Sequence, residues 1–299
     1  MNCEVTTVNE MTRIAVDAIG GDLGAPVVLE GVEMALAEDP NLEVVICGPA
    51  DAVEPFAQSH DRCIAQPCTE EIAMDEHPAQ AVRKKKDSSI VVGCRLVKEG
   101  QAQGFFSAGS TGACLTAATL VMGRIKGVMR PAIATIIPSP AKPVVMCDVG
   151  ANADCKPSYL VQFGQMAAVY AEQVIGIPDP SVALLNIGTE DSKGGELQKA
   201  VYPLLQKAGD AGYIHFIGNI EARDVPLGGA DVVVADGFSG NVLLKTIEGT
   251  AKFMSGMMKD MFKRNLLTKL AALACRSGIQ DFKKKMDYRE TGGTLLLGL

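Results

Sequence analysis

Short apolar segments alternate with helix-like segments along most of the chain, and this alternation most limits how the chain can fold. The strand-like segments are residues 13–18, 43–47, 104–107, 132–137, 144–147, 182–186, 213–217 and 231–235. The helix-like segments are residues 27–37, 88–98, 111–122, 158–175, 195–208 and 241–262. Most strand-like segments are apolar throughout, which is typical of strands covered on both faces. The pattern predicts an α/β fold with a mainly parallel, doubly wound sheet and helices on both faces.

Turns rich in glycine and hydroxyl groups follow five of these apolar segments. They are Asp17-Ala-Ile-Gly-Gly-Asp22, Ser107-Ala-Gly-Ser-Thr-Gly112, Asp148-Val-Gly-Ala-Asn152, Asn186-Ile-Gly188 and Asp236-Gly-Phe-Ser-Gly-Asn241. In open parallel sheets, ligands bind beyond the carboxyl ends of the strands. Free backbone N–H groups near helix starts favour an anion such as phosphate. We therefore expect the five turns to line one anion-binding crevice.

The composition indicates a globular protein and argues against a nucleic-acid partner and a metal site. Hydrophobic residues make up 47% of the 299 residues and charged residues 21%, which predicts a sizeable buried core. The net charge of −7, with 5% aromatic residues and no Trp, argues against a nucleic-acid partner. The nine cysteines include no CxxC pair, so we expect reduced thiols in a cytoplasmic protein and no metal site.

The domain organisation is expected to be simple. Residues 1–10 are polar and predict a flexible N-terminal extension, and residues 11–299 predict a single α/β domain. No apolar run approaches the roughly 20 residues that span a bilayer. The chain ends on an apolar strand-like run at residues 294–299, which predicts either a strand at a sheet edge or a truncated chain.

Residues 252–285 predict a projecting amphipathic helical segment. Apolar residues recur at helical spacing from Phe253 to Leu273, with cations between them. The Met-rich first half is typical of a core-facing helix or a dimer interface. The second half is apolar nearly all round, which is typical of a helix at a membrane surface. The candidate membrane-binding residues are Leu266, Leu267, Leu270 and Leu273.

Two of the turns are the strongest candidates for binding phosphate. Each lies between an apolar strand and a predicted helix, where the helix dipole and free donors act together. The candidate residues, with a cation before Pro131, are Ser107, Gly109, Ser110, Thr111, Gly112, Arg130, Gly237, Ser239, Gly240 and Asn241. Ordinary capping is the alternative, with Ser110 or Thr111 capping one helix and Asn241 the other.

The candidate catalytic residues are two amides and two cations: Asn152, Asn186, Lys193 and Lys245. Lys193, like Arg130, is equally explained as a solvated surface charge. The three histidines form no convincing Ser–His–Asp set, which disfavours a covalent serine mechanism. Neither the dinucleotide fingerprint nor the P-loop occurs, which weakens a dehydrogenase or kinase interpretation.

These segments together resemble the acyl-acyl-carrier-protein:phosphate acyltransferases of bacterial phospholipid synthesis. The matching motifs are the segment 13–22, the other four turns, Gly218-Asn-Ile-Glu-Ala-Arg-Asp224, the extension of the last turn to Lys245, and Asp287-Tyr-Arg-Glu290. The resemblance implies a homodimeric fold of the isopropylmalate-dehydrogenase type. It also implies that acyl phosphate is made from acyl-acyl-carrier-protein and orthophosphate without a cofactor, at the inner face of the cell membrane.

Other expectations follow from this resemblance. An acidic carrier protein needs positive charge, and the candidate docking residues are Arg83, Lys84, Lys85, Lys86, Lys263 and Arg264. Chains of the family continue with a further strand and helix, so the C-terminus is expected to be truncated. Direct attack of phosphate on the thioester is the expected mechanism. The alternatives are an inactive membrane-binding scaffold and, more distantly, an NAD-dependent dehydrogenase of the related fold.

Overall fold

The computed structural model describes residues 11–21, 23–140, 142–280 and 293–299. The chain divides into two compact units, residues 1–124 with Leu299, and residues 125–298. The sequence predicted a single α/β domain from 11 to 299, and the structure instead gives each unit its own sheet. The predicted extension 1–10 and part of the predicted helical segment, 281–285, lie outside the described residues, as does the motif 287–290.

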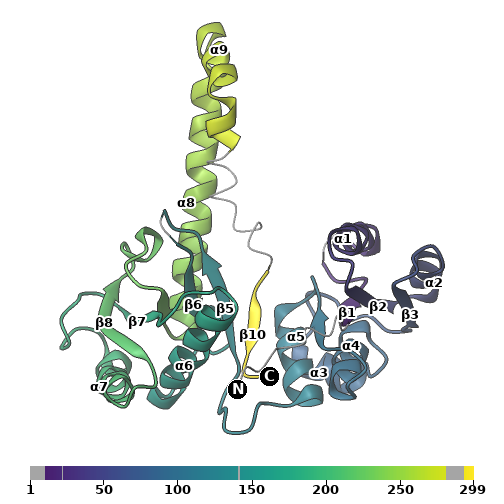
Figure 1. Cartoon of the computed structure of the whole chain (residues 1–299), viewed down its shortest axis with the longest axis horizontal. Helices are drawn as coiled ribbons and strands as arrows, with labels where there is room; N and C mark the ends of the chain where they lie inside the picture. The colour runs from purple at the N-terminus through teal and green to yellow at the C-terminus, as the bar shows by residue number, and fades with distance from the viewer. Residues whose placement is uncertain (1–10, 22, 141, 281–292) are drawn as a thin grey trace, which may run out of the picture. The chain divides into compact units, whose positions relative to one another are not determined.

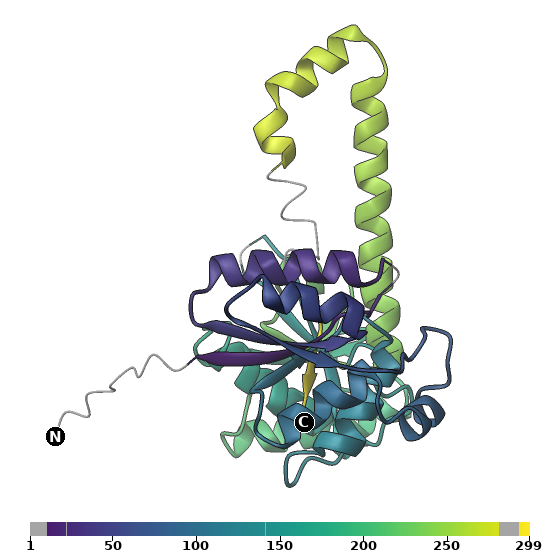
Figure 2. The same cartoon turned by 90° about the vertical axis from the view of Figure 1, so that its right-hand side faces the viewer.

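The first unit is built on a parallel sheet of four strands. These are β1 (Thr12–Asp17), β2 (Leu42–Gly48), β3 (Cys63–Pro67) and β4 (Gly104–Phe106), in the order β3-β2-β1-β4. Its helices are α1 (Ala25–Glu38), α2 (Ala50–Gln58), α3 (Pro78–Lys84), α4 (Ser89–Lys98) and α5 (Thr111–Ala117), which continues as the π-helical turn η1 (Ala118–Met122). Helices α1 and α2 cover one face of the sheet and α4 covers the other (Figures 1 and 2).

The second unit has six strands, in the order β10-β5-β6-β9-β7-β8. They are β5 (Ala132–Ile137), β6 (Val144–Cys147), β7 (Ser181–Asn186), β8 (His215–Glu221), β9 (Val232–Val234) and β10 (Leu295–Leu297). Strands β6, β9, β7 and β8 are parallel, whereas β10 and β6 each run antiparallel to β5. Of the two possibilities for residues 294–299, the structure shows the edge strand.

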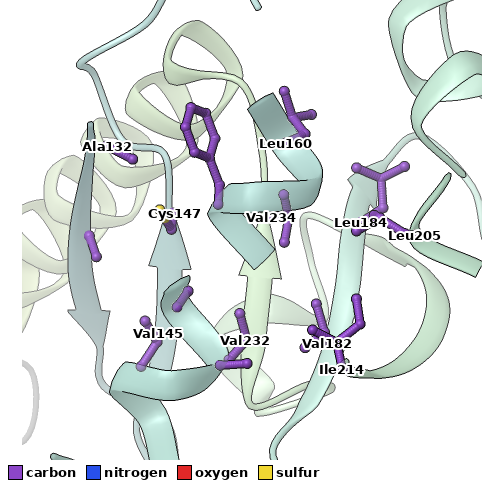
Figure 3. Packing of buried hydrophobic residues seen from close by; sticks show 14 of the residues in the cluster. Ala132, Val145, Cys147, Leu160, Val182, Leu184, Leu205, Ile214, Val232 and Val234 are labelled. Carbon is purple, nitrogen blue, oxygen red and sulfur yellow. The ribbon is translucent and has the colours of Figure 1, made fainter. Parts of the chain in front are cut away.

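Helices cover both faces of the second sheet. The helices of this unit are α6 (Pro157–Gln173), α7 (Glu196–Asp210), the short 3₁₀ helix η2 (Val225–Leu227), α8 (Gly237–Lys263) and α9 (Leu266–Ala274), and α9 lies away from the sheet. Figure 3 shows Val145, Val182 and Val232 on the face that α6 and α7 cover. The first half of α8 packs on the opposite face through Leu243, Leu244 and Ile247.

The predicted α/β fold with its mainly parallel sheets is therefore confirmed, with local corrections. The sequence placed a strand at 213–217, whereas β8 covers His215–Glu221. Residues 211–213 instead close the end of α7, because the N–H of Tyr213 donates to the carbonyl of Ala208. Helix α8 begins at Gly237, four residues before the predicted start.

The Met-rich half of α8 was predicted to be either a core-facing helix or a dimer interface, and the structure does not support the first of these. Beyond Ala251, α8 extends past the sheet of its unit and α9 follows it (Figure 1). Phe253, Met257 and Met261 are all more than half exposed. The core-facing interpretation is therefore wrong for these three residues, because among the described residues no strand or helix of the sheet layers covers them.

Candidate functional site

Three of the five turns meet at one edge of the second sheet. Strands β6, β9 and β7 are parallel neighbours, so their carboxyl ends lie side by side. The turns that follow them are 148–152, 236–241 and the loop that begins at Asn186. These three turns therefore lie together at the edge of the sheet where α/β proteins bind ligands, and the anion-binding crevice stays a prediction. The turns after Asp17 and Ser107 follow the neighbouring strands β1 and β4 of the first unit.

Asp148 organises the turn that follows β6. Its side chain is fully buried and accepts five hydrogen bonds. Oδ1 accepts from the N–H groups of Ile133 (3.0 Å), Gly150 (3.2 Å) and Ala151 (3.0 Å). Oδ2 accepts from the N–H (2.8 Å) and the side-chain amide (2.9 Å) of Asn152. These N–H groups point inward, so the expectation that they are free to bind an anion is wrong for this turn.

The start of α8 packs directly on the same turn. The N–H of Gly237 donates to the carbonyl of Asn152 at 2.8 Å. A Cβ on Gly237 would lie 2.6 Å from that carbonyl oxygen, and one on Gly240 would overlap the carbonyl oxygen of Asp148. Only glycine allows this close approach of backbone to backbone. The two glycines thereby hold the N-terminus of a 27-residue helix against the turn.

Asp236 is the N-cap of α8. Its carboxylate accepts from the N–H of Ser239 and from the Ser239 hydroxyl, both at 2.8 Å. The predicted phosphate ligand Ser239 therefore already has a partner, and Asn241 is not the helix cap. Within the described ranges, no hydrogen bond involves the side-chain amide of Asn241, whose Cγ lies 3.8 Å from the position of a Cβ on Gly150. This amide is open to a ligand.

Asn186 shapes the loop after β7 rather than projecting from it. The residue is buried, its Oδ1 accepts from the N–H of Ile187 (2.8 Å), and its Nδ2 donates to the carbonyl of Lys193 (3.2 Å). The Nζ of Lys193 lies 3.8 Å from Glu190 at the surface. Asn219, on the neighbouring strand β8, also supports this loop by donating to the Glu190 carbonyl at 2.8 Å. Asn219 belongs to the motif 218–224, and its role in this loop was not predicted.

The predicted cations of the second unit differ in their surroundings. Arg130 precedes Pro131, and the Pro131 carbonyl accepts from the Asn152 amide at 2.9 Å. The guanidinium of Arg130 lies 5.9 Å from the ring centre of Tyr159. Lys245 is 64% exposed and pairs with Glu248 at 2.8 Å. Lys245 lies nine residues beyond Asp236, about 13 Å along the helix. The structure therefore does not bring Lys245 to the turns.

The candidate turn of the first unit is organised by a second buried carboxylate. The hydroxyl of Ser107 donates to Asp17 Oδ2 at 2.7 Å and accepts from the N–H of Gly109 at 2.9 Å. Asp17 Oδ1 accepts from the N–H of Ile19. A Cβ on Gly20 would lie 2.6 Å from the nitrogen of Gly109, so the two turns of this unit are in direct contact. Ser107 therefore holds the turns together.

At the start of α5, some hydrogen-bond donors are available to a ligand. Ser110 is the N-cap, accepting from the N–H of Ala113 at 3.4 Å, as one predicted alternative has it. The N–H groups of Thr111 and Gly112 lie in the first helical turn, where the helix supplies no acceptor. Thr111 is exposed, and its hydroxyl has no hydrogen bond within the described ranges. These groups could meet an anion.

The predicted docking cations lie in both units. In the first, Lys85 Nζ pairs with Glu76 at 2.5 Å, and Lys86 Nζ donates to the carbonyl of Val82. Arg83 and Lys84 are exposed in the last turn of α3. In the second unit, Lys263 and Arg264 are exposed where α8 ends.

The four predicted membrane-binding leucines are exposed on α9. Leu267 is 79% exposed, and none of the residues of α9 is buried. Asn265 caps this helix by accepting from the N–H of Thr268 at 2.9 Å. Among the described residues, no helix combines the length and the apolar character needed to cross a bilayer.

The thiols nearest the turns are poor nucleophiles. Burial raises the pKa of Cys155, which donates to the Asn152 carbonyl, to about 11. Burial also raises the pKa of Cys114, near Ser107. The thiolate is the reactive form, and it is scarce at neutral pH when the pKa is raised. In the described part of the chain, no cluster of three or more His, Cys, Asp or Glu side chains could hold a metal ion.

Comparison with known proteins adds a family and a set of relatives. A family model described as fatty acid synthesis protein matches residues 12–299. The chain is 49% identical over 293 residues to a phosphate acyltransferase from Desulfitobacterium hafniense strain Y51, covering 97% of this chain and 86% of that protein. It is 46% identical over 288 residues to a phosphate acyltransferase from Lysinibacillus sphaericus strain C3-41, covering 96% and 86%.

Solved structures share the fold at much lower identity. The EutD phosphotransacetylase from Staphylococcus aureus superposes with a TM-score of 0.58 at 19% identity, covering 81% of this chain and 83% of that one. A protein described as a 4-hydroxythreonine-4-phosphate dehydrogenase from Salmonella typhimurium gives 0.51 at 13% identity, covering 79% and 85%. These similarities support the α/β fold alone.

Proposed function

This chain belongs to the fatty acid synthesis protein family, and on that premise we propose that it converts acyl-acyl-carrier-protein and orthophosphate into acyl phosphate and free carrier protein. The observation that carries the proposal is the 49% identity to a phosphate acyltransferase over nearly the whole chain. The acyl phosphate would serve phospholipid synthesis. No cofactor is needed for this transfer.

The reaction is a direct displacement. A phosphate oxygen attacks the thioester carbonyl carbon, a C–O bond forms, and the C–S bond breaks. The proton of the attacking phosphate neutralises the leaving thiolate, which departs as the thiol of the carrier protein. The enzyme would act by holding phosphate beside the carbonyl and by stabilising the oxyanion with fixed donors.

In the described part of the chain no activated nucleophile lies near the turns, which supports direct attack. The hydroxyls of Ser239 and Ser107 donate to Asp236 and Asp17, and no histidine activates them among the described residues. The raised pKa of the Cys155 thiol disfavours a thioester intermediate on that residue.

We assign phosphate binding to the N-terminus of α8 and treat the start of α5 as a second candidate. At α8 the donor is the Asn241 amide, with Gly237 and Gly240 setting its position and Arg130 as the cation. At α5 they are Thr111 and Gly112, with Ser107, Gly109 and Ser110 in supporting roles. Asn152 and Asn186 act as positioning residues, and Lys193 is the remaining candidate cation.

The function is tested by trapping the product. Purified protein is incubated with palmitoyl-acyl-carrier-protein and phosphate, and hydroxylamine converts acyl phosphate into a hydroxamate that is measured. We expect hydroxamate only when both substrates are present. An inactive scaffold yields none, and accumulation of a stably acylated Ser or Cys in the mass spectrum would show that direct attack is wrong.

The exposed end of α3 is the proposed docking site for the acidic carrier protein. We expect the double variant Arg83→Glu/Lys84→Glu to raise KM for acyl-acyl-carrier-protein about tenfold at low salt, because charges at an interface rim chiefly set encounter. Steady-state kinetics at several salt concentrations measure this. The control Lys98→Glu/Lys207→Glu reverses the same charge at exposed sites on α4 and α7. An equal KM for both double variants would remove the proposal for α3, leaving Lys263 and Arg264 as candidates.

The exposed arm of α8 and α9 is proposed to form a homodimer through its Met-rich half and to touch an anionic membrane surface through its leucines. Full burial of one Leu contributes about 1.5–3 kcal/mol, so partial insertion of four gives reversible attachment. We expect Leu267→Glu/Leu270→Glu to reduce flotation with anionic liposomes at least tenfold. The control Leu227→Glu changes an exposed leucine in η2. Equal flotation of the double variant and the wild type would end the membrane proposal.

A further inference from the structure

The loop that carries Arg130 belongs to the second unit and leads into β5. Residues 123–131 form no helix and no strand, so much of the loop's shape depends on contacts with neighbouring elements. A tight turn lies within it, because the N–H of Val128 donates to the carbonyl of Ile125 at 3.0 Å. Gly127 supplies the φ of +96° at the third position of this turn, a conformation that favours glycine.

The carboxamide of Gln162, on α6, makes two hydrogen bonds to this loop. Its Oε1 accepts from the N–H of Met129 at 2.8 Å, and its Nε2 donates to the carbonyl of Gly127 at 2.9 Å. Turning the amide over would set oxygen against oxygen and N–H against N–H, so one orientation satisfies both groups. Gln162 thereby pairs with the loop backbone as a neighbouring strand would, up to the residue before Arg130.

The residue after Arg130 is held from the other side, by the turn 148–152. The Pro131 carbonyl accepts from the side-chain amide of Asn152 at 2.9 Å, and the same amide donates to Asp148 at 2.9 Å. Side chains therefore fix both chain neighbours of Arg130, one from α6 and one from the turn after β6. The backbone of Arg130 has little freedom to move.

An aromatic ring lies beside the Arg130 side chain. The guanidinium carbon is 5.9 Å from the ring centre of Tyr159, within the roughly 6 Å of a cation–π contact. Tyr159 precedes Gln162 by three residues, so the two side chains share one face of α6. Within the described ranges the guanidinium makes no hydrogen bond and no ion pair. Its five N–H groups are therefore open to a ligand.

The position of Tyr159 places this guanidinium at the ligand-binding edge of the second sheet. Helix α6 connects β6 and β7, which are both parallel to β9, so α6 begins at the carboxyl edge where β6 ends. Tyr159 lies in the first turn of α6. The start of a helix also carries partial positive charge. A guanidinium held at this edge with open donors suits an oxyanion such as phosphate.

We infer that Tyr159 and Gln162 are positioning residues that hold the Arg130 guanidinium in place for orthophosphate. The inference rests on the proposed function and names residues that act on phosphate through Arg130 rather than by contact. Ordering one flexible side chain on binding weakens affinity about two- to tenfold. In this chain the ring and the two backbone hydrogen bonds order the arginine beforehand.

The first test measures KM for phosphate at saturating palmitoyl-acyl-carrier-protein. We expect Gln162→Leu and Tyr159→Leu each to raise this KM about fivefold, with kcat and KM for the acyl donor within about twofold of the wild type. Tyr159→Phe keeps the ring, so it should rescue the KM that Tyr159→Leu loses. The matched control is Gln165→Leu, which replaces another half-buried glutamine of α6, one that makes no hydrogen bond in the described part of the chain.

A double-mutant cycle separates positioning from general damage to the fold. Arg130→Ala should raise KM for phosphate about tenfold or more, because it removes charge-assisted hydrogen bonds. Adding Gln162→Leu should then raise it no further, since the group on which Gln162 acts is gone. An equal effect of Gln162→Leu with and without Arg130 would overturn the inference. A rise in KM for the acyl donor with an unchanged KM for phosphate would also overturn it.

A second measurement does not depend on turnover. Phenylglyoxal modifies exposed arginines such as Arg130, and peptide mass spectrometry follows this modification at increasing concentrations of inorganic phosphate. We expect phosphate to protect Arg130 in the wild type, and half-protection in Gln162→Leu to need about fivefold more phosphate. An active enzyme whose Arg130 is not protected overturns the inference and leaves the proposed function intact. A protected Arg130 in a wild type that forms no hydroxamate does the reverse.

Discussion

Replacing Gly240 by alanine should destabilise the second unit and lower activity at least tenfold. A methyl group at this position would overlap the carbonyl oxygen of Asp148, which is backbone and cannot rotate away. The start of α8 must then move off the turn 148–152. Overpacking of this kind costs about 1–3 kcal/mol, and occasionally more. Because the same movement displaces Asn241, we expect kcat/KM to fall at least tenfold.

The control for Gly240→Ala is available on the same helix. Gly249 is exposed, and a Cβ there would meet no atom within 4 Å. Gly249→Ala should therefore stabilise the protein by up to about 1 kcal/mol through helix propensity. Urea unfolding followed by circular dichroism measures both, and hydroxamate formation measures activity. Equal stability and activity in the two variants would show that the contact between α8 and the turn is dispensable.

The apolar segments predicted the strands well because a parallel strand buried on both faces has to be apolar throughout. β6 and β9 are such strands, with Val144–Cys147 and Val232–Val234 fully buried. The edge strand β3 was not predicted, because Cys63–Pro67 carries Gln66 and Pro67 and is only partly buried. The hydrophobic pattern of a segment does not show which strands it pairs with, so the division into two sheets was not predicted.

The sequence predicted the positions of the turns correctly but not the hydrogen bonding of their N–H groups. Their N–H groups were expected to be free, whereas in three of them an aspartate at the carboxyl end of a strand accepts some of those groups. The sequence held the signal, since Asp17, Asp148 and Asp236 each open a turn directly after an apolar strand. Asp side chains commonly bond backbone N–H groups one to three residues on. Reading these residues as acceptors would have left Thr111, Gly112 and Asn241 as the open groups.

Asp148→Asn should unfold the second unit more readily than any other near-isosteric change at these turns. The buried carboxylate accepts five hydrogen bonds through two oxygens, and an amide keeps only one of those oxygens. Whichever way the amide turns, its NH₂ faces at least two donors that lose their acceptor. At about 1.5–3 kcal/mol for each hydrogen bond to a charged group, we expect a loss of about 3–6 kcal/mol in the free energy of unfolding.

The measurement for Asp148→Asn has to separate the two units, because the chain can unfold in more than one transition. Hydrogen exchange of the Ile133 and Ala151 amides reports on the second unit, since both donate to Asp148. We expect their exchange to accelerate at least a hundredfold, with amides of the first unit unchanged. Asp154→Asn makes the same chemical change at an exposed site and should leave exchange unaltered. If the Ile133 and Ala151 amides exchange in Asp148→Asn at the same rates as in the wild type, the carboxylate is not what holds the turn. The packing of Gly237 and Gly240 would then hold it.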